Sequence, residues 1–394
     1  MHVLIIPSWY PRFATDINGV FFREQALALQ KSGIKVGVIS PQLRSLASPI
    51  STFRGPYGPA FEWDQGLPTF RDHAVAWFPK FTSAGMKLWI RRGLHLYNWY
   101  VREQGTPDLI HVHSLLNAGL VAQVIRQRTG VPYIVTEHAS TFGRGALTGR
   151  QIRMAAAAAK SAALCFAVSA SLSKLLERKL AADGRKWFVM PNIVEERFTN
   201  YPLLTPEDYR DEFRFVAIAV LTENKAIDNV IRAFAQAFGG DSSVTLEIGG
   251  EGIEKRRLES LVAQSGLSNR VFFLGALSRD DVIQTISRAD VFVSGSRYET
   301  FGVVIAEALA LGRPVIATKC GGPETIVREE DGFLVPPDDV PSLAQAMLEI
   351  RSTYGRFDAG SIKEACIARF SEQVVVRRLI DSYEAVLSEA QRGI

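Results

Sequence analysis

Apolar and polar positions follow two different patterns along the chain. Short runs that are almost continuously apolar are separated by longer segments in which apolar residues recur every three or four positions. The first pattern predicts strands buried on both faces, and the second predicts amphipathic helices that cover them. In the first half the predicted strands are HVLIIPS (2–8), KVGVISP (35–41), DLIHVHS (108–114), PYIVTEH (132–138), ALCFAVS (163–169) and WFVMPN (187–192).

The same alternation begins again after residues 192–213, a stretch rich in proline and charge that we interpret as a linker. The second set of predicted strands is FRFVAIAVL (213–221), VTLEIGG (244–250), RVFFLGAL (270–277), DVFVSGS (290–296) and PVIATK (314–319). The chain, at 394 residues, is also longer than the roughly 250–300 residues at which a single core stops growing. We therefore predict an α/β protein of two doubly wound domains, residues 1–192 and 193–370, followed by an amphipathic helix within 371–394. Ligands of such sheets bind beyond the carboxyl ends of the strands, so we expect a central cleft there.

Charge divides the chain in the same way as the strand pattern does. Residues 1–193 hold 23 Lys and Arg against 10 Asp and Glu, which is +13; the remainder holds 22 against 31, which is −9, in agreement with the net +4. A basic first half favours an anionic partner such as a phosphate or a membrane surface. The three cysteines are odd in number and far apart, which favours a reducing compartment, and the short apolar run at the start does not match a signal peptide. We expect a cytoplasmic protein.

Two glutamates stand out in the apolar passage SRYETFGVVIAEALALG, residues 296–312. Glu299 follows a predicted strand, and Thr300 is a candidate N-cap for a helix that begins near Phe301 or Gly302. Free backbone N–H groups at such a helix start, beside a glycine without a side chain, can approach a phosphate. Glu307 could accept hydrogen bonds from the two hydroxyls of a diol. The alternative is that Glu299 is a helix-start charge and Glu307 a buried, paired acid.

Other residues are candidates because they lie where predicted strands end. Lys225, beyond 213–221, could meet a phosphate as a point charge, although a lone loop lysine is more often only solvated. Gly19 opens a predicted helix and either leaves room for an anion or only serves the turn. The glycine run 249–252 lacks the third glycine of a dinucleotide-binding loop at the required spacing, so it argues little for nicotinamide binding.

Three histidines lie on two predicted strands of the first half. His111 and His113 share one face of a strand, and His138 ends another, where it could bind a substrate hydroxyl. A zinc site is one interpretation of three histidines, but packing and hydrogen bonding within a buried strand is the interpretation we prefer.

A basic amphipathic helix is predicted near residues 86–102. Its apolar stripe is flanked by cations, and such helices can lie on anionic membranes, although a helix that covers the sheet with its cations in water is the interpretation we prefer. The stripe consists of Met86, Ile90, Leu94, Tyr97 and Val101, and the cations are Lys87, Arg91, Arg92 and Arg102.

Taken together, these passages resemble the retaining glycosyltransferases of family 4, which have the GT-B fold. In the second half the resemblance rests on VAIAVLTENKAIDNVIRAF, LEIGGEGIEKRRLESL and YETFGVVIAEALALGRPVIATKCGG, with seven residues between the two glutamates. In the first half it rests on SWYPRFATDINGVFFREQALAL, DLIHVHS, TEHAS, FAVSASLSKLL and VMPNIVEERF. It covers nearly the whole chain and implies two Rossmann-like domains, an N-terminal one for the acceptor and a C-terminal one for a nucleotide-sugar, with the last helix crossing back to the N-terminal domain.

The resemblance implies a role for each candidate residue. Glu299 would touch the donor sugar and Glu307 the nucleotide ribose, while Lys225 and the backbone amides of Gly302 and Val303, next to Phe301, would hold the diphosphate. His138 would lie near the transferred sugar and Gly19 near the phosphates. The family needs no divalent metal, so no metal and no cofactor are expected beside the nucleotide-sugar co-substrate.

The chain departs from the family pattern at one point. Where the pattern has Gly-Arg before the lysine, this chain has Ala219 and Val220, and the missing arginine also binds the diphosphate. Losing that charge could lower the rate by the order of 10²-fold. Arg297 and Lys319 are possible substitute cations.

From these observations we expect a hexosyltransferase that moves a sugar from a nucleotide-sugar to a glycan or lipid-linked acceptor in bacterial exopolysaccharide, capsule or lipopolysaccharide synthesis. We expect no nucleic-acid partner, and a peripheral contact with the inner face of an anionic membrane. The alternatives are a GT-B-fold sugar-nucleotide epimerase and a degenerate nucleotide-sugar-binding subunit.

Overall fold

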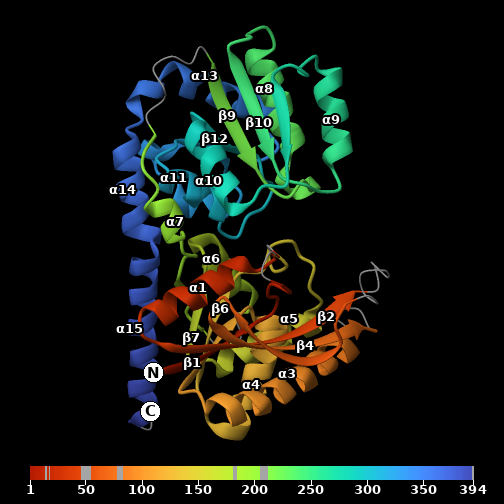
Figure 1. Ribbon diagram of the computed structural model, residues 1–394, viewed down its shortest axis with the longest axis vertical. Coiled ribbons are helices and arrows are strands. Elements are labelled where there is room, and N and C mark those ends of the chain that lie inside the picture. The colour runs from red at the N-terminus through yellow and green to blue at the C-terminus, as the bar shows by residue number, and fades with distance from the viewer. Residues whose placement is uncertain are drawn as a thin grey trace. The chain divides into compact units, whose positions relative to one another are not determined.

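The protein folds into two compact units, each built on its own sheet (Figure 1). The structure is a computed structural model, and it describes residues 1–13, 16, 18–45, 55–77, 83–180, 184–204 and 212–392. Unit 1 consists of Met1–Ile193 and Val375–Ile394, and unit 2 consists of Val194–Val374. Of the predicted linker, residues 205–211 lie outside the described residues.

Unit 1 contains an eight-stranded sheet in the order β3-β4-β2-β1-β5-β6-β7-β8. Every neighbouring pair is parallel except β3 and β4. The six strands predicted from apolar runs all lie in the parallel part, as expected for strands covered on both faces, and β4 adds a parallel strand that was not predicted. The strands are β1 His2–Pro7, β2 Lys35–Ser45, β3 Gly58–Asp64, β4 Leu67–Ala76, β5 Leu109–His113, β6 Tyr133–Glu137, β7 Leu164–Ala167 and β8 Phe188–Val189.

The β3–β4 hairpin is absent from our sequence interpretation. Its two strands pair from Gly58 with His73 to Asp64 with Leu67, so the loop consists only of Gln65 and Gly66. Both loop residues have positive φ, 54° and 93°, which is the conformation of the two-residue turn that suits the twist of a hairpin. The glycine in DQGL was the sequence signal for this turn, but the strands on either side lack the continuous apolar character that we used to find strands.

Helices cover both faces of the unit 1 sheet. In Figure 1, α3 and α4 lie on the opposite side of the sheet from α1. The C-terminal helix α15 joins α1: its Val375, Leu379 and Tyr383 are buried in one core with Val3 and Ile5 of β1. The predicted return of the last helix to the N-terminal domain is therefore confirmed. The helices are α1 Val20–Lys31, α3 Ser83–Gln104, the single π-turn η1 Leu115–Gly119, α4 Leu120–Thr129, α5 Gly149–Ser161, α6 Ala170–Lys179 and α15 Glu372–Gln391.

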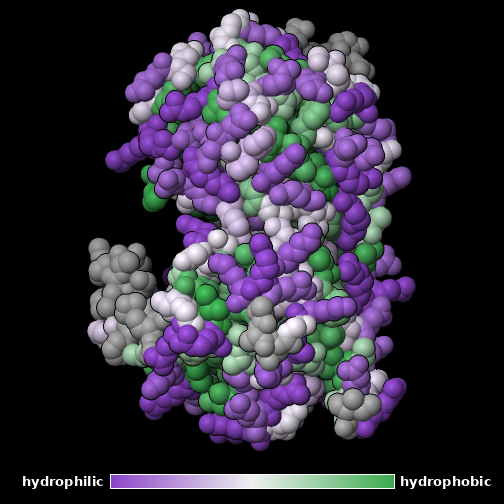
Figure 2. Space-filling model, turned by 180° about the vertical axis from the view of Figure 1, so that it is seen from behind, coloured by the Kyte–Doolittle hydropathy of each residue, from purple (hydrophilic) through white to green (hydrophobic). Residues whose placement is uncertain are grey.

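The apolar stripe of residues 86–102 packs inside unit 1. Helix α3 contacts β2 and β4, and Met86 and Tyr97 of the stripe are buried, while Ile90, Leu94 and Val101 are half-buried. The interpretation of this stripe as a membrane-facing surface is therefore wrong, because the sheet already covers it. Hydrophilic side chains predominate on the face of the molecule in Figure 2, with hydrophobic ones interspersed among them. Within the described part of the chain, no helix combines the length and the apolar character that crossing a membrane requires.

Unit 2 contains a six-stranded, wholly parallel sheet in the order β11-β10-β9-β12-β13-β14. Helix α8 packs against α9 and α13, and α11 packs against α14. The strands are β9 Phe213–Ile218, β10 Val244–Gly249, β11 Val271–Gly275, β12 Val291–Ser294, β13 Val315–Thr318 and β14 Gly332–Val335. The helices are α7 Glu196–Thr199, η3 Glu223–Lys225, α8 Ile227–Phe238, α9 Lys255–Gln264, α10 Arg279–Arg288, α11 Val303–Ala310, α12 Pro323–Ile326, η4 Glu329–Asp331, α13 Val340–Ser352, η5 Tyr354–Arg356 and α14 Ala359–Phe370.

Candidate functional site

The candidate residues of unit 2 meet beyond the carboxyl ends of β9, β12 and β13. Lys225 lies in the short helix η3 after β9, and its ammonium group forms an ion pair with Oε1 of Glu299. The same carboxylate oxygen accepts a hydrogen bond of 2.8 Å from the hydroxyl of Ser296. The backbone of Glu299 is fixed as well, because its N–H donates to Cys320 and its carbonyl accepts from Gly322, both after β13. The structure thus brings together two residues that lie 74 positions apart in sequence.

Helix α11 begins directly after this ion pair, and no side chain caps it. Our expectation that Thr300 is the N-cap is wrong: the N-cap is Gly302, with φ of 102°, and the helix begins at Val303. A positive φ is strained for residues other than glycine, so Gly302 allows the sharp entry into the helix. The first N–H groups of a helix have no intrahelical partners, so the start of α11 can accept an anion.

Phe301 contributes only its backbone to this edge of the sheet. Its ring is 1% exposed and packs edge-on against Phe370 at 5.6 Å between ring centroids. The loop after β13 crosses close above it, since a Cβ atom on Gly322 would come within 2.1 Å of the carbonyl oxygen of Phe301.

Glu307 lies farther along α11 and is buried, with 1% of its surface exposed. Its Oε1 accepts a hydrogen bond of 2.6 Å from Nη2 of Arg279 in α10, and its Oε2 has no hydrogen-bond partner within the described residues. Burial raises the pKa of Glu307, and the positive charge of Arg279 opposes this rise. The buried acid is therefore paired through one oxygen only.

Arg279 joins Glu307 to the first residues of unit 2, and it is the residue of this site that our sequence analysis missed. The same Nη2 also donates to Glu195, and the guanidinium group lies over the ring of Phe198 at 4.6 Å. Glu195 is further paired with Arg197 at 2.8 Å. Burial alone would lower the pKa of Arg279, but the charges of Glu307 and Glu195 outweigh it and raise the pKa. The only available signal was the position of Arg279 after a strand, in FFLGALSRDD.

The two possible substitute cations differ in what they contact. Arg297 is engaged, since its Nε donates to Asp338 at 2.8 Å and its Nη1 to the carbonyl of Glu223. Lys319 follows β13 with an exposed side chain. Val220, where the family pattern has arginine, is 50% exposed. A charge at position 220 would thus reach solvent, whereas Arg297 is already used to hold the η3 loop.

The glycine run 249–252 serves close packing of the backbone. A Cβ atom on Gly250 would lie 1.8 Å from the carbonyl oxygen of Ala219, and one on Gly252 would lie 2.2 Å from that of Leu221. These glycines let the segment after β10 lie directly against the segment after β9. This close packing of the backbone explains the glycine run without a bound dinucleotide.

In unit 1, Gly19 stands at the start of α1 as predicted, again without a side-chain cap. Its φ is 82°, and a Cβ atom there would lie 3.0 Å from Cδ1 of Trp9. The first turn of α1 holds no acidic residue that would compete with an anion.

His138 directly follows β6 and is part of a buried chain of imidazoles. Its Nε2 lies 3.0 Å from Nδ1 of His113, while His111 contacts the hydroxyls of Tyr383 at 2.7 Å and Thr136 at 2.8 Å. Burial lowers the pKa of His111 and of His138 to about 3, and it also holds the pKa of His113 well below its usual value. All three rings are therefore neutral at neutral pH. Among the residues that the structure describes, no group of three His, Cys, Asp or Glu side chains could hold a metal ion.

Glu137, the last residue of β6, fixes the backbone around His138. One carboxylate oxygen accepts from the N–H groups of His138 at 2.9 Å and Ala139 at 2.8 Å, and the other accepts from Leu115 at 2.8 Å. Burial raises the pKa of Glu137, and these backbone donors oppose the rise. The carboxylate thereby ties the loop after β6 to the turn after β5.

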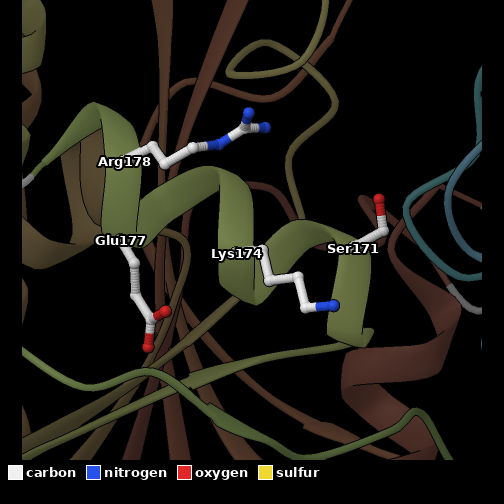
Figure 3. A pocket seen from close by; sticks show the side chains of 4 residues that line it. All are labelled: Ser171, Lys174, Glu177 and Arg178. Atoms are coloured by element: carbon white, nitrogen blue, oxygen red, sulfur yellow. The ribbon is translucent and has the colours of Figure 1, made fainter.

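A depression of about 680 Å³ lies along α6, which follows β7 in unit 1. It is lined by Ser171, Lys174, Glu177 and Arg178, and in Figure 3 the carboxylate of Glu177 points away from the ammonium group of Lys174. Glu177 also accepts a hydrogen bond of 3.0 Å from the N–H of Trp187. The two cations therefore give the depression a positive character.

Comparisons with known proteins match both units. A family model described as "Glycosyl transferase 4-like domain" matches residues 19–192, and one described as "Glycosyl transferases group 1" matches residues 206–355. Among curated proteins, the chain is 28% identical over 375 residues to TuaC of Bacillus subtilis (strain 168), a glycosyltransferase named for teichuronic acid biosynthesis. The match covers 88% of each chain.

Solved structures share the fold of both units. Sucrose-phosphate synthase from Thermosynechococcus elongatus superposes with a TM-score of 0.78 at 22% identity and covers 98% of this chain and 99% of its own. HepE from Anabaena, solved in complex with UDP and glucose, superposes with a TM-score of 0.73 at 20% identity and covers 98% of this chain and 100% of its own. The predicted fold class is confirmed.

Proposed function

Because the chain belongs to the group 1, 4-like family of glycosyltransferases, which have the GT-B fold and use nucleotide-sugar donors, we propose that it moves a hexose-type sugar to a glycan or lipid-linked acceptor with retention of anomeric configuration. The observation that carries this proposal is the arrangement in unit 2. The Lys225–Glu299 ion pair stands beside the uncapped start of α11, and the unpartnered oxygen of Glu307 lies farther along the same helix.

The three features suit the three parts of a nucleotide-sugar. Oε2 of Glu307 can accept from the ribose hydroxyls while Oε1 stays with Arg279. The N–H groups of Gly302 and Val303 can bind the diphosphate, and the ammonium group of Lys225 has three donors, so it can hold both a phosphate oxygen and Glu299. Glu299 would accept hydrogen bonds from the hydroxyls of the donor sugar.

The proposed reaction breaks the bond between the anomeric carbon and the diphosphate oxygen, and the bond's electron pair leaves with the diphosphate. The acceptor oxygen forms the new bond to the anomeric carbon, and its proton passes to the departing diphosphate. Lys225 and the helix start would stabilise the charge that gathers on the leaving diphosphate, which is where a preorganised site lowers the barrier most. In unit 1, His138 would contact the transferred sugar, and Gly19 would contact the phosphates.

We propose an acceptor that belongs to bacterial polysaccharide synthesis and carries negative charge. TuaC, the curated relative reported above, is named for an acidic polymer. The +13 balance of residues 1–193 and the two cations along α6 favour the same charge on the acceptor.

One observation favours a second candidate function, a nucleotide-sugar-binding subunit without transferase activity. Val220 places no charge where the family pattern has an arginine, and Arg297 is held by Asp338 and by the η3 loop. Such a protein would bind the donor but stabilise the leaving diphosphate too weakly for turnover.

A panel of UDP-, GDP- and ADP-sugars tests the proposal, with nucleotide release followed with and without glycan and lipid-linked acceptors. We expect release with one base only, dependent on an acceptor, and lost in Glu299→Ala but not in Glu349→Ala, which removes an exposed acid of α13. Donor binding without release would indicate the binding subunit. An epimerised sugar formed without any acceptor would indicate the epimerase. Full activity of Glu299→Ala would contradict the proposed site.

A further inference from the structure

His113 is buried beside His138 and contacts it through a defined ring nitrogen. Only 1% of its surface is exposed, and its Nδ1 lies 3.0 Å from Nε2 of His138. The rings of Phe22 and His111 pack against it at 4.6 and 4.3 Å between centroids. This packing leaves the His113 ring little freedom to turn.

In this contact one of the two facing nitrogens carries a hydrogen atom and the other accepts it. Because burial keeps both imidazoles neutral at neutral pH, each ring carries a single N–H group. Either Nδ1–H of His113 donates to His138, or Nε2–H of His138 donates to His113. The choice also decides what the opposite nitrogen of His138, Nδ1, offers to a ligand: an N–H donor in the first arrangement and a lone pair in the second.

The surroundings of the outer nitrogens favour the first arrangement. Nε2 of His113 is buried and has no hydrogen-bond partner within the described part of the chain. In the second arrangement this atom would carry a hydrogen without an acceptor, which is rarer in proteins than an acceptor without a donor. In the first arrangement it carries only a lone pair, next to the ring of Phe22, and the hydrogen lies instead on Nδ1 of His138, whose ring interacts with the side chain of Asn192.

Nδ1 of His138 is buried and makes no hydrogen bond of regular geometry within the described residues. The side chain of Asn192 interacts with the His138 ring and opposes the fall in its pKa, as an acceptor beside a ring N–H does. His111 has no ring nitrogen left for a ligand, since both of its ring nitrogens are hydrogen-bonded, one to Tyr383 and the other to Thr136.

We propose that His113 is a positioning residue that holds His138 in the tautomer with hydrogen on Nδ1, so that His138 donates a hydrogen bond to an oxygen atom of the sugar. This inference rests on the proposed function for the part that involves the sugar. The tautomer itself does not depend on it. Glu137 completes the arrangement by fixing the backbone of His138.

Nitrogen NMR of the ¹⁵N-histidine-labelled full chain tests the tautomer directly. We expect His138, assigned by the loss of its signals in His138→Ala, to carry hydrogen on Nδ1. In His113→Asn the side-chain amide nitrogen stands near the position of Nδ1 and can still donate, so the His138 tautomer is kept. In His113→Leu it is lost. Hydrogen on Nε2 of His138 in the unsubstituted protein would overturn the proposal, whether or not the protein proves to be a transferase.

Transfer kinetics test the consequence for the proposed function. We expect His113→Leu to lower kcat about 10-fold or more with little change in the donor KM, and His113→Asn to recover most of the loss. In a His138→Ala background, His113→Leu should have no further effect, because His113 acts only through His138. An equal loss in both backgrounds, or a loss in His113→Asn as large as in His113→Leu, would show a merely structural role. His73→Asn, at a buried histidine of β4 outside this group of imidazoles, is the matched control and should keep the activity.

Discussion

The candidate residues of the two units are held in place by opposite means. In unit 2, Lys225 pairs with Glu299 and Arg279 with Glu307, so that charged groups orient each other at the start of α11. In unit 1, His138 is held by a neutral imidazole. A charged environment suits a nucleoside diphosphate, and a neutral, buried one suits the hydroxyls of a sugar. Each of the following experiments should therefore affect one unit and spare the other.

The largest expected effect is on the stability of unit 2. Arg279→Leu would leave Glu307 buried without its counterion, and breaking a buried pair in this way costs about 3–5 kcal/mol. Urea unfolding should show that loss for unit 2. Arg257→Leu is the matched control: it removes a half-exposed arginine paired with Glu254 and should cost about 1 kcal/mol or less. Equal losses in the two variants would mean that Arg279 does not hold the buried acid.

The next effect concerns catalysis. Glu299→Ala should lower the transfer rate about 10²–10³-fold, the range found when one preorganised polar group is removed from an active site. Nucleotide binding, measured by calorimetry, should persist because Lys225 then has no acid to neutralise it. If binding of the nucleotide is lost together with the rate, Glu299 shapes the whole site rather than meeting the sugar.

Sequence reasoning found the charged site more readily than the neutral one. Glu299, Lys225 and Gly302 stand at the ends of apolar strands, where a charge or a glycine is conspicuous, and the structure brings the first two into contact. The pairing of Glu307 could not be deduced, because Arg279 reaches it from a neighbouring helix and is one cation among several in its segment. The helix α11 also begins later than predicted, since Gly302 rather than Thr300 caps it.

The histidine chain shows the limit of such reasoning more clearly. The ring of His111 is hydrogen-bonded to the hydroxyl of Tyr383, which is 272 positions away in the sequence. Only the return of α15 to unit 1 creates that contact. The strand pattern predicted most of the parallel strands of both sheets, but it missed the parallel edge strand β14 and the β3–β4 hairpin, whose exposed edge strand lacks an apolar run. Patterns of burial can be read from sequence, whereas partners that meet through tertiary packing cannot.

A smaller effect should appear in the pH dependence of unit 1. Burial lowers the pKa of His111 and His138 to about 3, below the value of about 6.5 in the unfolded chain, so the unfolded chain binds more protons between these values. The free energy of unfolding should therefore fall as the pH drops below about 6.5, by about 2 kcal/mol per buried histidine at pH 5. Unfolding of unit 1 followed between pH 7 and 5 measures this slope.

Two substitutions make the pH test specific. His138→Ala should reduce the slope, and His95→Gln, at an exposed histidine of α3, should leave it unchanged. A slope that is the same in all three proteins would show that other groups cause it.

The smallest expected effect concerns the missing arginine. Val220 is half exposed beside the η3 loop, so Val220→Arg can add a cation near the diphosphate without burying it. We expect nucleoside diphosphates to bind several-fold more tightly, an effect of about 1 kcal/mol, with Val220→Leu as the uncharged control. No gain over Val220→Leu would mean that the diphosphate does not lie against this segment.

The central claim is that unit 2 holds a nucleotide-sugar with Glu307 at the ribose and Lys225 at the diphosphate. Calorimetric titration of UDP, GDP, ADP and inorganic diphosphate into the protein, Glu307→Gln and Lys225→Met tests it most directly. Glu307→Gln should weaken the nucleotide that binds by about 10-fold, because an amide offers the ribose hydroxyls one acceptor fewer, and should leave inorganic diphosphate unaffected. Lys225→Met should weaken both. Equal binding of the nucleotide by all three proteins would contradict the account.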